Sequence, residues 1–396
     1  MIVEPINPLY LQNILTISHF YETHGGGIER VAGHLCRQFA RQRVTPYWAA
    51  SASDALPEDD LKTIALRCID PLEKLTGLPM PLPGPGAIFA LINAVRRSDA
   101  VVIHDALYVT SILGMIMAKL HRKPVILIQH IAAIPFRSTL LRLLMHLANS
   151  FVTRPMLWAA DARVFISDTV RQDLLGNSAR HPYKLLFNGV DSAIFYPPAH
   201  SENRQNLQAQ YHLPPGTRCI LFVGRYVEKK GLSVLRARAA TRPDCQFLLA
   251  GSGPLRPAEW GLSNVHDLGV QTPVALAELY RCADLLLLPA VGEGYPLVIQ
   301  EAMACGLPVI CGTPSHRADP NAVNWLYGVN IDLNDPQHSA QRCSVAIDKY
   351  VLPPHEREAM ICYAKEHYSW QTMAQEILKL AQSAKDRKTN GEAGRK

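Results

Sequence analysis

The stretch GEGYPLVIQEAMACGLPVI, residues 292–310, places two carboxylates eight positions apart. Glu293 stands between two glycines, which indicates a loop, whereas Glu301 lies in an apolar segment that predicts a helix over Leu297–Cys305. A β-type run, Val309–Cys311, follows at once. A helix that begins directly after a glycine-rich loop leaves its first backbone amides free to bind an anion. We therefore interpret this stretch as part of a ligand site, with the two acids contacting different ends of the ligand.

Length and composition set the broad class of the protein. The chain has 396 residues, 48% of them hydrophobic and 19% charged, which predicts two or three globular domains. The net charge of +6 is mild, and no dense basic tract interleaved with aromatics suggests a nucleic-acid partner. The charge remains compatible with an anionic small molecule or an anionic membrane surface.

Several sequence features indicate a cytoplasmic protein. The nine cysteines are scattered and form no Cys-x-x-Cys pair, as expected in a reducing compartment. The first residues lack a basic region and a small-residue cleavage site, so we expect no signal peptide. No uninterrupted apolar stretch reaches the roughly 18–20 residues that a membrane-spanning helix needs.

Short apolar runs alternate with helical patterns in both halves of the chain. Their nearly continuous apolar character is typical of parallel strands buried on both faces. The helix between the first two runs is predicted over Ile28–Arg41, where an apolar stripe opposes charged residues. The predicted strands are Asn13–Ser18, Ala100–His104, Pro124–Gln129, Arg163–Ile166, Cys219–Val223, Gln246–Ala250, Val265–Leu268, Leu285–Leu288 and Val309–Cys311. This order predicts two doubly wound α/β domains that face each other across a cleft.

Proline-rich and polar segments predict the boundaries between these parts. Pro79–Gly86 (PMPLPGPG) reads as a rigid loop, and residues 197–216 read as the linker between a domain at 1–200 and a domain at 201–367. The charged tail, residues 385–396, is expected to be disordered.

Residues that follow the strands are the candidate ligand contacts, since ligands of doubly wound folds bind at the carboxyl ends of the strands. Gly26 and Gly27 precede the Ile28 helix, and their amides can approach a phosphate or a sugar. Arg225 and Lys230 follow the strand Cys219–Val223 and suit a diphosphate. A tight turn and a solvated basic loop are the alternative interpretations of these two segments.

The loop and helix of the opening stretch add further candidates. Gly294 lies in the loop, and the amides of Tyr295, Leu297 and Val298 are expected to point toward an anion. His130 follows the strand Pro124–Gln129, and the His104-Asp105 pair follows the strand before it. From the sequence alone, His130 could equally be structural, and the His104-Asp105 pair could be a loop of the first domain near an acceptor or only a cap.

Taken together, these motifs resemble the family 4 retaining glycosyltransferases. The resemblance runs from about residue 13 to residue 380. It rests on the Glu-x7-Glu element, on GRYVEKKG (224–231), on FNGVDSAIFYP (187–197), on FLLAGSGPLR (247–256), on YSWQTMAQEIL (368–378), on HGGGIERVAGHL (24–35) and on PVILIQH (124–130). One segment departs from the family pattern: CGTPSHRADPNAV (311–323) lacks the usual glycine pair, so Thr313–Asp319 is left out of the expected site.

The resemblance implies a GT-B architecture of two Rossmann-like domains, with a C-terminal helix at about 368–383 that returns to the first domain. It implies a nucleotide-diphosphate sugar donor and a saccharide or lipid-linked acceptor, in cell-surface polysaccharide, lipopolysaccharide or glycolipid assembly. Arg225, Lys230, Glu293 and His130 would then be catalytic, and His130 would line the acceptor side. The implied mechanism is retaining, with the leaving phosphate accepting the proton of the acceptor. No cofactor or metal is expected, and the chain has no Asp-x-Asp motif.

Other interpretations remain open at this point. A sugar-nucleotide epimerase or a phosphorylase could share the architecture, and a non-catalytic protein could keep the nucleotide-sugar pocket. Residues 134–158 are apolar with interspersed arginines, which suits either peripheral contact with the cytoplasmic membrane face or a pair of core helices.

Overall fold

The computed structural model describes residues 11–71, 80–132, 139–176, 182–198, 209, 211, 213–214 and 216–393. The chain divides into two compact units. Unit 1 comprises Met1–Leu186 together with Trp370–Lys396, and unit 2 comprises Phe187–Ser369. The sequence had suggested a boundary near residue 200, within a linker that lies largely outside the described residues.

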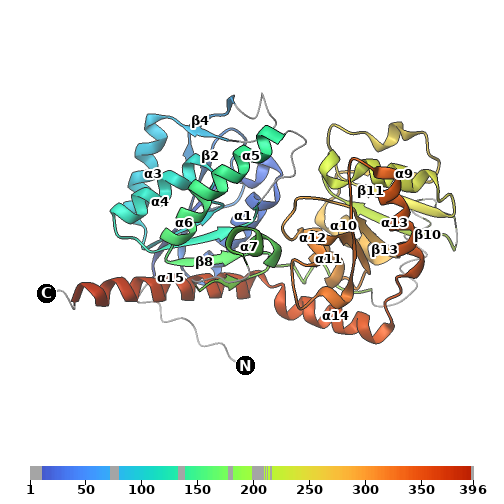
Figure 1. The fold of residues 1–396 in the computed structure, drawn as a ribbon. Helices are drawn as coiled ribbons and strands as arrows, with labels where there is room; N and C mark the ends of the chain where they lie inside the picture. The colour runs from blue at the N-terminus through green and yellow to red at the C-terminus, as the bar shows by residue number, and fades with distance from the viewer. Residues whose placement is uncertain are drawn as a thin grey trace. The chain divides into compact units, whose positions relative to one another are not determined.

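Unit 1 is built on a seven-stranded parallel sheet, whose strands are ordered β3-β2-β1-β6-β7-β8-β9. The strands are β1 (Asn13–Phe20), β2 (Thr45–Ser51), β3 (Lys62–Leu66), β6 (Ala100–His104), β7 (Val125–Gln129), β8 (Ala162–Phe165) and β9 (Lys184–Leu185). A small antiparallel pair, β4 (Cys68–Ile69) and β5 (Leu82–Pro83), accompanies them. The helices are α1 (Gly27–Arg41), α3 (Pro85–Arg97), α4 (Val109–Leu120), α5 (Thr139–Ala148), α6 (Arg154–Ala159), α7 (Asp168–Leu175) and α15 (Trp370–Ala393) (Figure 1).

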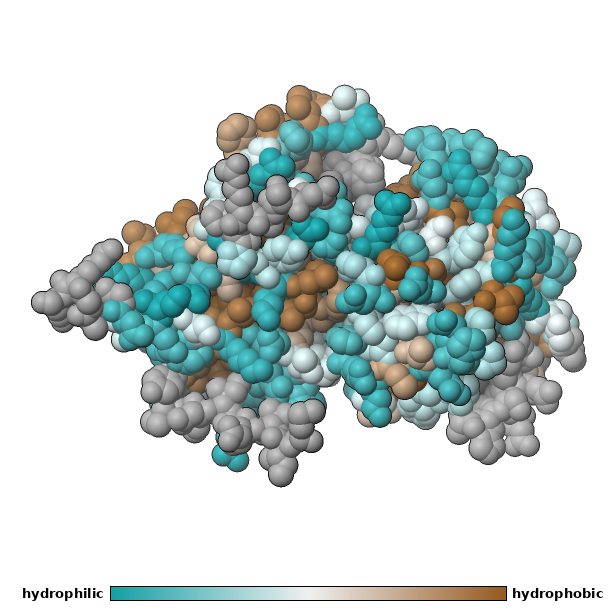
Figure 2. Space-filling model, turned by 60° about the horizontal axis from the view of Figure 1, so that its bottom comes forward, coloured by the Kyte–Doolittle hydropathy of each residue, from teal (hydrophilic) through white to brown (hydrophobic). Residues whose placement is uncertain are grey.

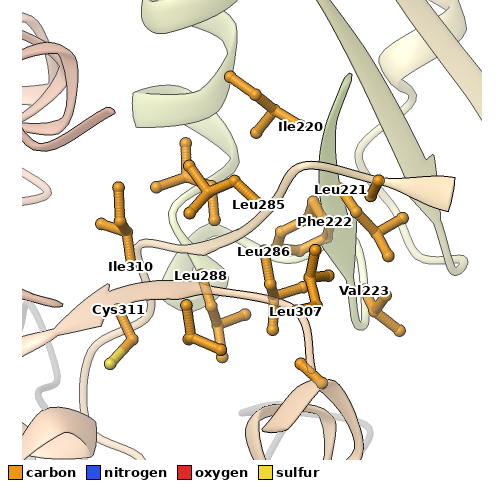
Figure 3. Close-up of a cluster of buried hydrophobic side chains, with 14 of the residues drawn as sticks. Ile220, Leu221, Phe222, Val223, Leu285, Leu286, Leu288, Leu307, Ile310 and Cys311 are labelled. Carbon is orange, nitrogen blue, oxygen red and sulfur yellow. The ribbon is translucent and has the colours of Figure 1, made fainter. Parts of the chain in front are cut away.

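Unit 2 is built on a six-stranded parallel sheet of order β12-β11-β10-β13-β14-β15. Its strands are β10 (Arg218–Val223), β11 (Cys245–Ala250), β12 (Val265–Gly269), β13 (Leu285–Leu288), β14 (Val309–Gly312) and β15 (Leu326–Val329). Its main helices are α9 (Leu232–Ala240), α10 (Pro273–Cys282), α11 (Leu297–Ala304), α12 (Thr313–His316), α13 (Pro336–Lys349) and α14 (Pro354–His367). Branched and aromatic side chains from β10, β13 and β14 form the core shown in Figure 3. On the face drawn in Figure 2, hydrophobic residues form separate patches among hydrophilic ones.

Both sheets reverse their strand order beside the first strand of the unit. The reversal lies between β1 and β6 in unit 1, and between β10 and β13 in unit 2. At such a point the connections leave the sheet in opposite directions, which opens a crevice at the carboxyl ends of the two strands. The topology therefore identifies one candidate binding position in each unit.

Every strand predicted from the sequence is present, with small shifts at the ends. Not predicted from the sequence were β2, β3, β9 and β15 of the two large sheets, and the small pair β4 and β5. A proline cannot donate a hydrogen bond to a neighbouring strand, so Pro46 weakens the strand pattern over β2, although β2 pairs with β1 and β3 on its two sides. The predicted rigid loop over Pro79–Gly86 is wrong in its second part, because β5 and the first turn of α3 occupy it.

The expected disorder after residue 385 is also wrong for residues 385–393, which continue α15. Lys385 Nζ lies 2.9 Å from Asp99 Oδ1, and Lys388 Nζ lies 3.0 Å from Asp161 Oδ2. Ala381 and Ala384 are buried on the same helix. The basic residues that suggested a solvated tail instead bind carboxylates at the sheet of unit 1, and α15 lies along elements from the first part of the chain (Figure 1).

The contact between α15 and Asp99 can be tested by mutation. Besides binding Lys385, Asp99 accepts hydrogen bonds at Oδ2 from the amides of Gln12 and Asn13. We expect Asp99→Ala to lower the free energy of unfolding by about 1–3 kcal/mol, since two amides lose their acceptor. Lys385→Ala, which removes only a partly exposed ion pair, should cost less, about 1 kcal/mol or under. Urea denaturation of the whole chain measures both effects, and equal losses in the two variants would contradict the role given to the amides.

The carboxylate of Asp99 also makes the stability of the fold depend on pH. Burial alone would raise the pKa of Asp99, but the bonds from Asn13 and Lys385 outweigh burial and lower it. A depressed carboxyl pKa contributes stability above the unfolded value of about 4, and that contribution is lost as the pH falls. The difference between wild type and Asp99→Ala should therefore shrink on acidification below about pH 4.

Candidate functional site

A close ion pair lies at the reversal point of the sheet of unit 2. Lys230 ends the short 3-10 turn η3 (Glu228–Lys230) after β10, and Glu293 lies in the loop after β13. Lys230 Nζ lies 2.6 Å from Glu293 Oε2, and Lys229 Nζ lies 4.0 Å from Glu293 Oε1. The structure thus brings two of the predicted site residues together at the position that the topology identifies.

Local backbone geometry explains why the pair forms. Gly231 has a φ of +78°, a left-handed conformation that favours glycine, and a Cβ on it would clash with the carbonyl oxygen of Pro289. Beside it, the amide of Val291 donates to the carbonyl of Lys229 at 2.9 Å. Because the turn after β10 is fastened to the loop after β13, Lys230 and Glu293 are held at neighbouring strand ends.

Positive charge accumulates around this pair. The pKa of Lys229 is lowered, first by desolvation and then by the like charges of Lys230 and Arg225, whereas Glu293 opposes the shift. Arg225 follows Gly224 at the end of β10 and is exposed. Lys229, Lys230 and Arg225 outnumber the carboxylates Glu293 and Glu228, the second of which accepts a hydrogen bond from Ser233. The remaining positive charge suits an anion.

Glu301 lies within α11, and its Oε2 accepts a hydrogen bond from the Tyr280 hydroxyl at 2.9 Å. Tyr280 is a buried residue of α10 and makes an edge contact with Phe195. The tyrosine fixes the direction of the carboxylate. Sequence reasoning missed Tyr280, since only the tertiary fold brings α10 beside α11.

Tyr295 has a structural side chain. It is 2% exposed, and its hydroxyl lies 2.9 Å from that of Tyr368, which in turn donates to Asp319 Oδ2 at 2.8 Å. Tyr363 donates to the same oxygen at 2.8 Å. This tyrosine–carboxylate cluster anchors the loop that carries Glu293 and Gly294, while Leu297 and Val298 form the first turn of α11. The loop that departs from the family pattern therefore supplies the buried acid Asp319.

Unit 1 holds its own polar group at the reversal point. His19 is a residue of β1, and its Nε2 lies 2.8 Å from Glu29 Oε1. Its ring stacks on the ring of Tyr108, with the two ring centroids 3.8 Å apart. Glu29 is in the first turn of α1, and a Cβ on Gly26 would clash with its carboxylate. The position beside Gly26, where a phosphate or a sugar was expected, therefore already holds a carboxylate of the protein, whereas nothing lies within 4 Å of a Cβ built on Gly27.

His130 lies in the same group, after β7. Its Nε2 is 3.0 Å from His104 Nδ1, and its amide donates to Asp105 Oδ1 at 2.8 Å. All three residues are buried. Burial lowers the pKa of His104 to about 3 and lowers that of His130 well below its ordinary range, so both rings are neutral at pH 7. Burial also raises the pKa of Asp105 to about 6.

The candidate residues thus form two groups, one in each unit. Lys230 and Glu293 form an ion pair in unit 2, where Arg225 contributes charge and Glu301 is held by Tyr280. Gly26, Gly27 and His130 belong to unit 1.

Comparison with known proteins agrees with this organisation. A model described as Glycosyltransferase Family 4 matches residues 25–193, and one described as Glycosyl transferases group 1 matches residues 217–348. Among curated relatives, alpha-maltose-1-phosphate synthase of Mycolicibacterium smegmatis is 28% identical, with 73% of this chain and 81% of that protein aligned. D-inositol 3-phosphate glycosyltransferase of the same organism is 30% identical, with 53% of this chain and 50% of that protein aligned.

Solved structures of the GT-B fold are similar over nearly the whole chain. Sucrose-phosphate synthase from Thermosynechococcus elongatus has a TM-score of 0.69 at 19% identity and covers 94% of this chain and 98% of its own. HepE from Anabaena, solved with UDP, has a TM-score of 0.69 at 17% identity and covers 94% of this chain and 100% of its own. The two family models, the relatives and the two doubly wound sheets lead to one assignment: the chain belongs to the family 4 glycosyltransferases.

Proposed function

We propose that the protein transfers a sugar, with retention and without a metal, from a nucleotide-diphosphate donor to a saccharide or lipid-linked acceptor. We place the reaction in the assembly of a cell-surface polysaccharide or glycolipid. The observation that carries the proposal is the Lys230–Glu293 ion pair at the reversal point of unit 2, with Arg225 beside it. HepE, a structural neighbour, has been solved with UDP and with UDP-glucose, which supports a nucleotide sugar as the donor.

In this proposal the donor diphosphate takes the place of Glu293 on Lys230. A diphosphate carries more negative charge than one carboxylate and offers several acceptor oxygens, so it competes well for the ammonium group. Arg225 and the first amides of α11 add further stabilisation as negative charge develops on the leaving group. The displaced Glu293 becomes free to accept hydrogen bonds from the sugar.

The remaining groups would hold the other parts of the two substrates. Glu301, oriented by Tyr280, is suited to accept hydrogen bonds from the ribose hydroxyls. The leaving phosphate would take the proton of the attacking hydroxyl on the same face of the sugar. Exclusion of water would limit hydrolysis of the donor.

If the diphosphate replaces Glu293 on Lys230, substitutions of Lys230 and of Glu293 should have opposite effects on nucleotide binding. We expect Lys230→Ala to weaken binding of a nucleoside diphosphate by about tenfold or more, because a charge-assisted contact is lost. Glu293→Gln should bind the same nucleotide at least as tightly as wild type, because the competing carboxylate is gone. Its rate of sugar transfer or donor hydrolysis should nevertheless fall by roughly 10²–10³-fold. Calorimetry with UDP, GDP and ADP measures the first two effects, and turnover of the matching nucleotide sugars measures the third.

Glu259→Gln is the matched control, since Glu259 is an exposed acid of the same unit whose salt bridge to Arg256 is also exposed. It should change neither binding nor turnover. Weaker nucleotide binding by Glu293→Gln would contradict the exchange, and no binding of any nucleotide by wild type would contradict the donor site. Binding without turnover of any nucleotide sugar would favour a non-catalytic protein, and turnover without transfer to an acceptor would favour an epimerase.

We also propose that the acceptor is presented at an anionic membrane surface to α5 of unit 1. No residue of α5 is buried, and Leu140, Leu143, Leu144 and Leu147 lie exposed at the spacing of one helical face. Phe151, which continues this face, is 75% exposed. Arg142 is exposed on the same helix, which suits an anionic headgroup. Arg154, by contrast, is partly buried and donates to the carbonyl of Leu174.

This surface predicts binding to lipid in the plane of the membrane, and no described helix is both long and apolar enough to span a bilayer. Wild type should sediment with vesicles of phosphatidylglycerol and phosphatidylethanolamine, and Leu144→Glu should reduce the bound fraction severalfold. Val351→Glu, at an exposed position in unit 2, should bind like wild type. Equal loss in both variants, or no sedimentation of wild type, would contradict the role of α5.

A further inference from the structure

The histidine pair at the reversal point of unit 1 contains a buried atom that the fold leaves unsatisfied. His104 Nε2 has no hydrogen-bond partner within the described part of the chain, and the ring is 0% exposed. Its other nitrogen, Nδ1, is 3.0 Å from His130 Nε2. Because both rings are neutral, each carries one proton, and a single proton lies between them.

Two arrangements of that proton are possible, and they differ in what they leave at His104 Nε2. If His130 donates, His104 carries its own proton on Nε2, where an N–H is buried without an acceptor. If His104 donates from Nδ1, its Nε2 is a bare lone pair. Buried N–H groups without acceptors are rarer in proteins than buried acceptors without donors, so the second arrangement is favoured. In that arrangement His130 must carry its proton on Nδ1.

The backbone of His130 is fixed by the residue next to His104. Asp105 Oδ1 accepts from the amide of His130 at 2.8 Å and from that of Ile131 at 3.3 Å. Asp105 itself has a φ of +60°, an uncommon conformation for a residue other than glycine. Its amide donates to the carbonyl of Ile128 at 2.9 Å, which ties the turn after β6 to β7. Strain of this kind persists where the surrounding contacts hold the residue in place.

We propose that His104 and Asp105 are positioning residues for His130: Asp105 holds its backbone, and His104 sets its tautomer so that Nδ1 is a hydrogen-bond donor. Under the proposed function, on which this role in the reaction rests, His130 then donates to an oxygen of the bound sugar and does not act as a general base. The other ionisable groups of the cluster, His19, Glu29 and Tyr108, lie on β1, on α1 and at the start of α4.

The tautomer is tested directly by nitrogen-15 NMR of the imidazoles, which needs no substrate. His130 in wild type should show a protonated Nδ1 and an unprotonated Nε2. His104→Asn places an amide near the former Nδ1 and can still donate to His130, so the pattern should be kept. His104→Gln places its amide near the former Nε2, and His130 should become a mixture of tautomers. An Nε2-protonated His130 in wild type, or an unchanged pattern in His104→Gln, would overturn the proposal.

Asp105 is tested by hydrogen exchange. Asp105→Ala should speed exchange of the His130 and Ile131 amides by tenfold or more, whereas Asp105→Asn keeps an acceptor, tolerates the left-handed φ and should exchange like wild type. Equal exchange in both variants would remove Asp105 from the proposal. Thermal unfolding of all four variants shows which of them fold.

Activity separates this inference from the proposed function. His104→Gln should lower kcat for transfer by about tenfold or more and leave UDP affinity unchanged, because the donor contacts lie in unit 2, and His104→Asn should recover most of the rate. If wild type binds no nucleotide, the proposed function fails while the NMR and exchange results still decide this inference. A change in KM for the donor with kcat unchanged would count against a positioning role.

Discussion

Burial of the central strands on both faces is the constraint on which the rest of this structure depends. All residues are buried in the central strands β6, β7, β11 and β13. Charged residues lie in the connections that follow the ends of the strands. An ion or a polar group inside such a sheet would lose its hydration without a partner, which costs several kcal/mol or more. The reversal of strand order then selects one strand end in each unit. The Lys230–Glu293 pair and the His104–His130 pair both lie there.

The Lys230–Glu293 pair and the His104–His130 pair differ in charge and in exposure. In unit 2 the side chains remain partly exposed and charged, with Lys230 14% and Glu293 13% exposed, so an incoming anion can exchange with the carboxylate. In unit 1 the rings of His104 and His130 are almost wholly buried and neutral. They can form directed hydrogen bonds but carry no net charge. The contact between His19 Nε2 and Glu29 Oε1 also places a carboxylate at the N-terminus of α1. An anion therefore fits the surroundings of Lys230 in unit 2 better, and a neutral polar group fits those of His130 in unit 1 better.

Much of the fold could be predicted because it depends on local pattern. Apolar runs such as AVVIH (100–104) and LLLL (285–288) identify their strands without tertiary information. The misses depend on contacts between distant residues. The basic end of α15 reads as a solvated tail until Asp99 and Asp161 are placed beside it, and Pro46 does not prevent β2 from pairing on both sides. In the candidate site, local motifs are enough to name Glu293 and Lys230 as candidates. Tyr280 and the tyrosines around Asp319 could not be named from the sequence, because packing between distant segments brings them to their partners.

The most direct test of the account is a structure of the protein with a bound nucleoside diphosphate. The account predicts diphosphate oxygens within hydrogen-bonding distance of Lys230 and Arg225, and a Glu293 carboxylate that has moved off the ammonium group. A diphosphate bound elsewhere, or a Lys230–Glu293 contact that persists at 2.6 Å with the nucleotide in place, would contradict it.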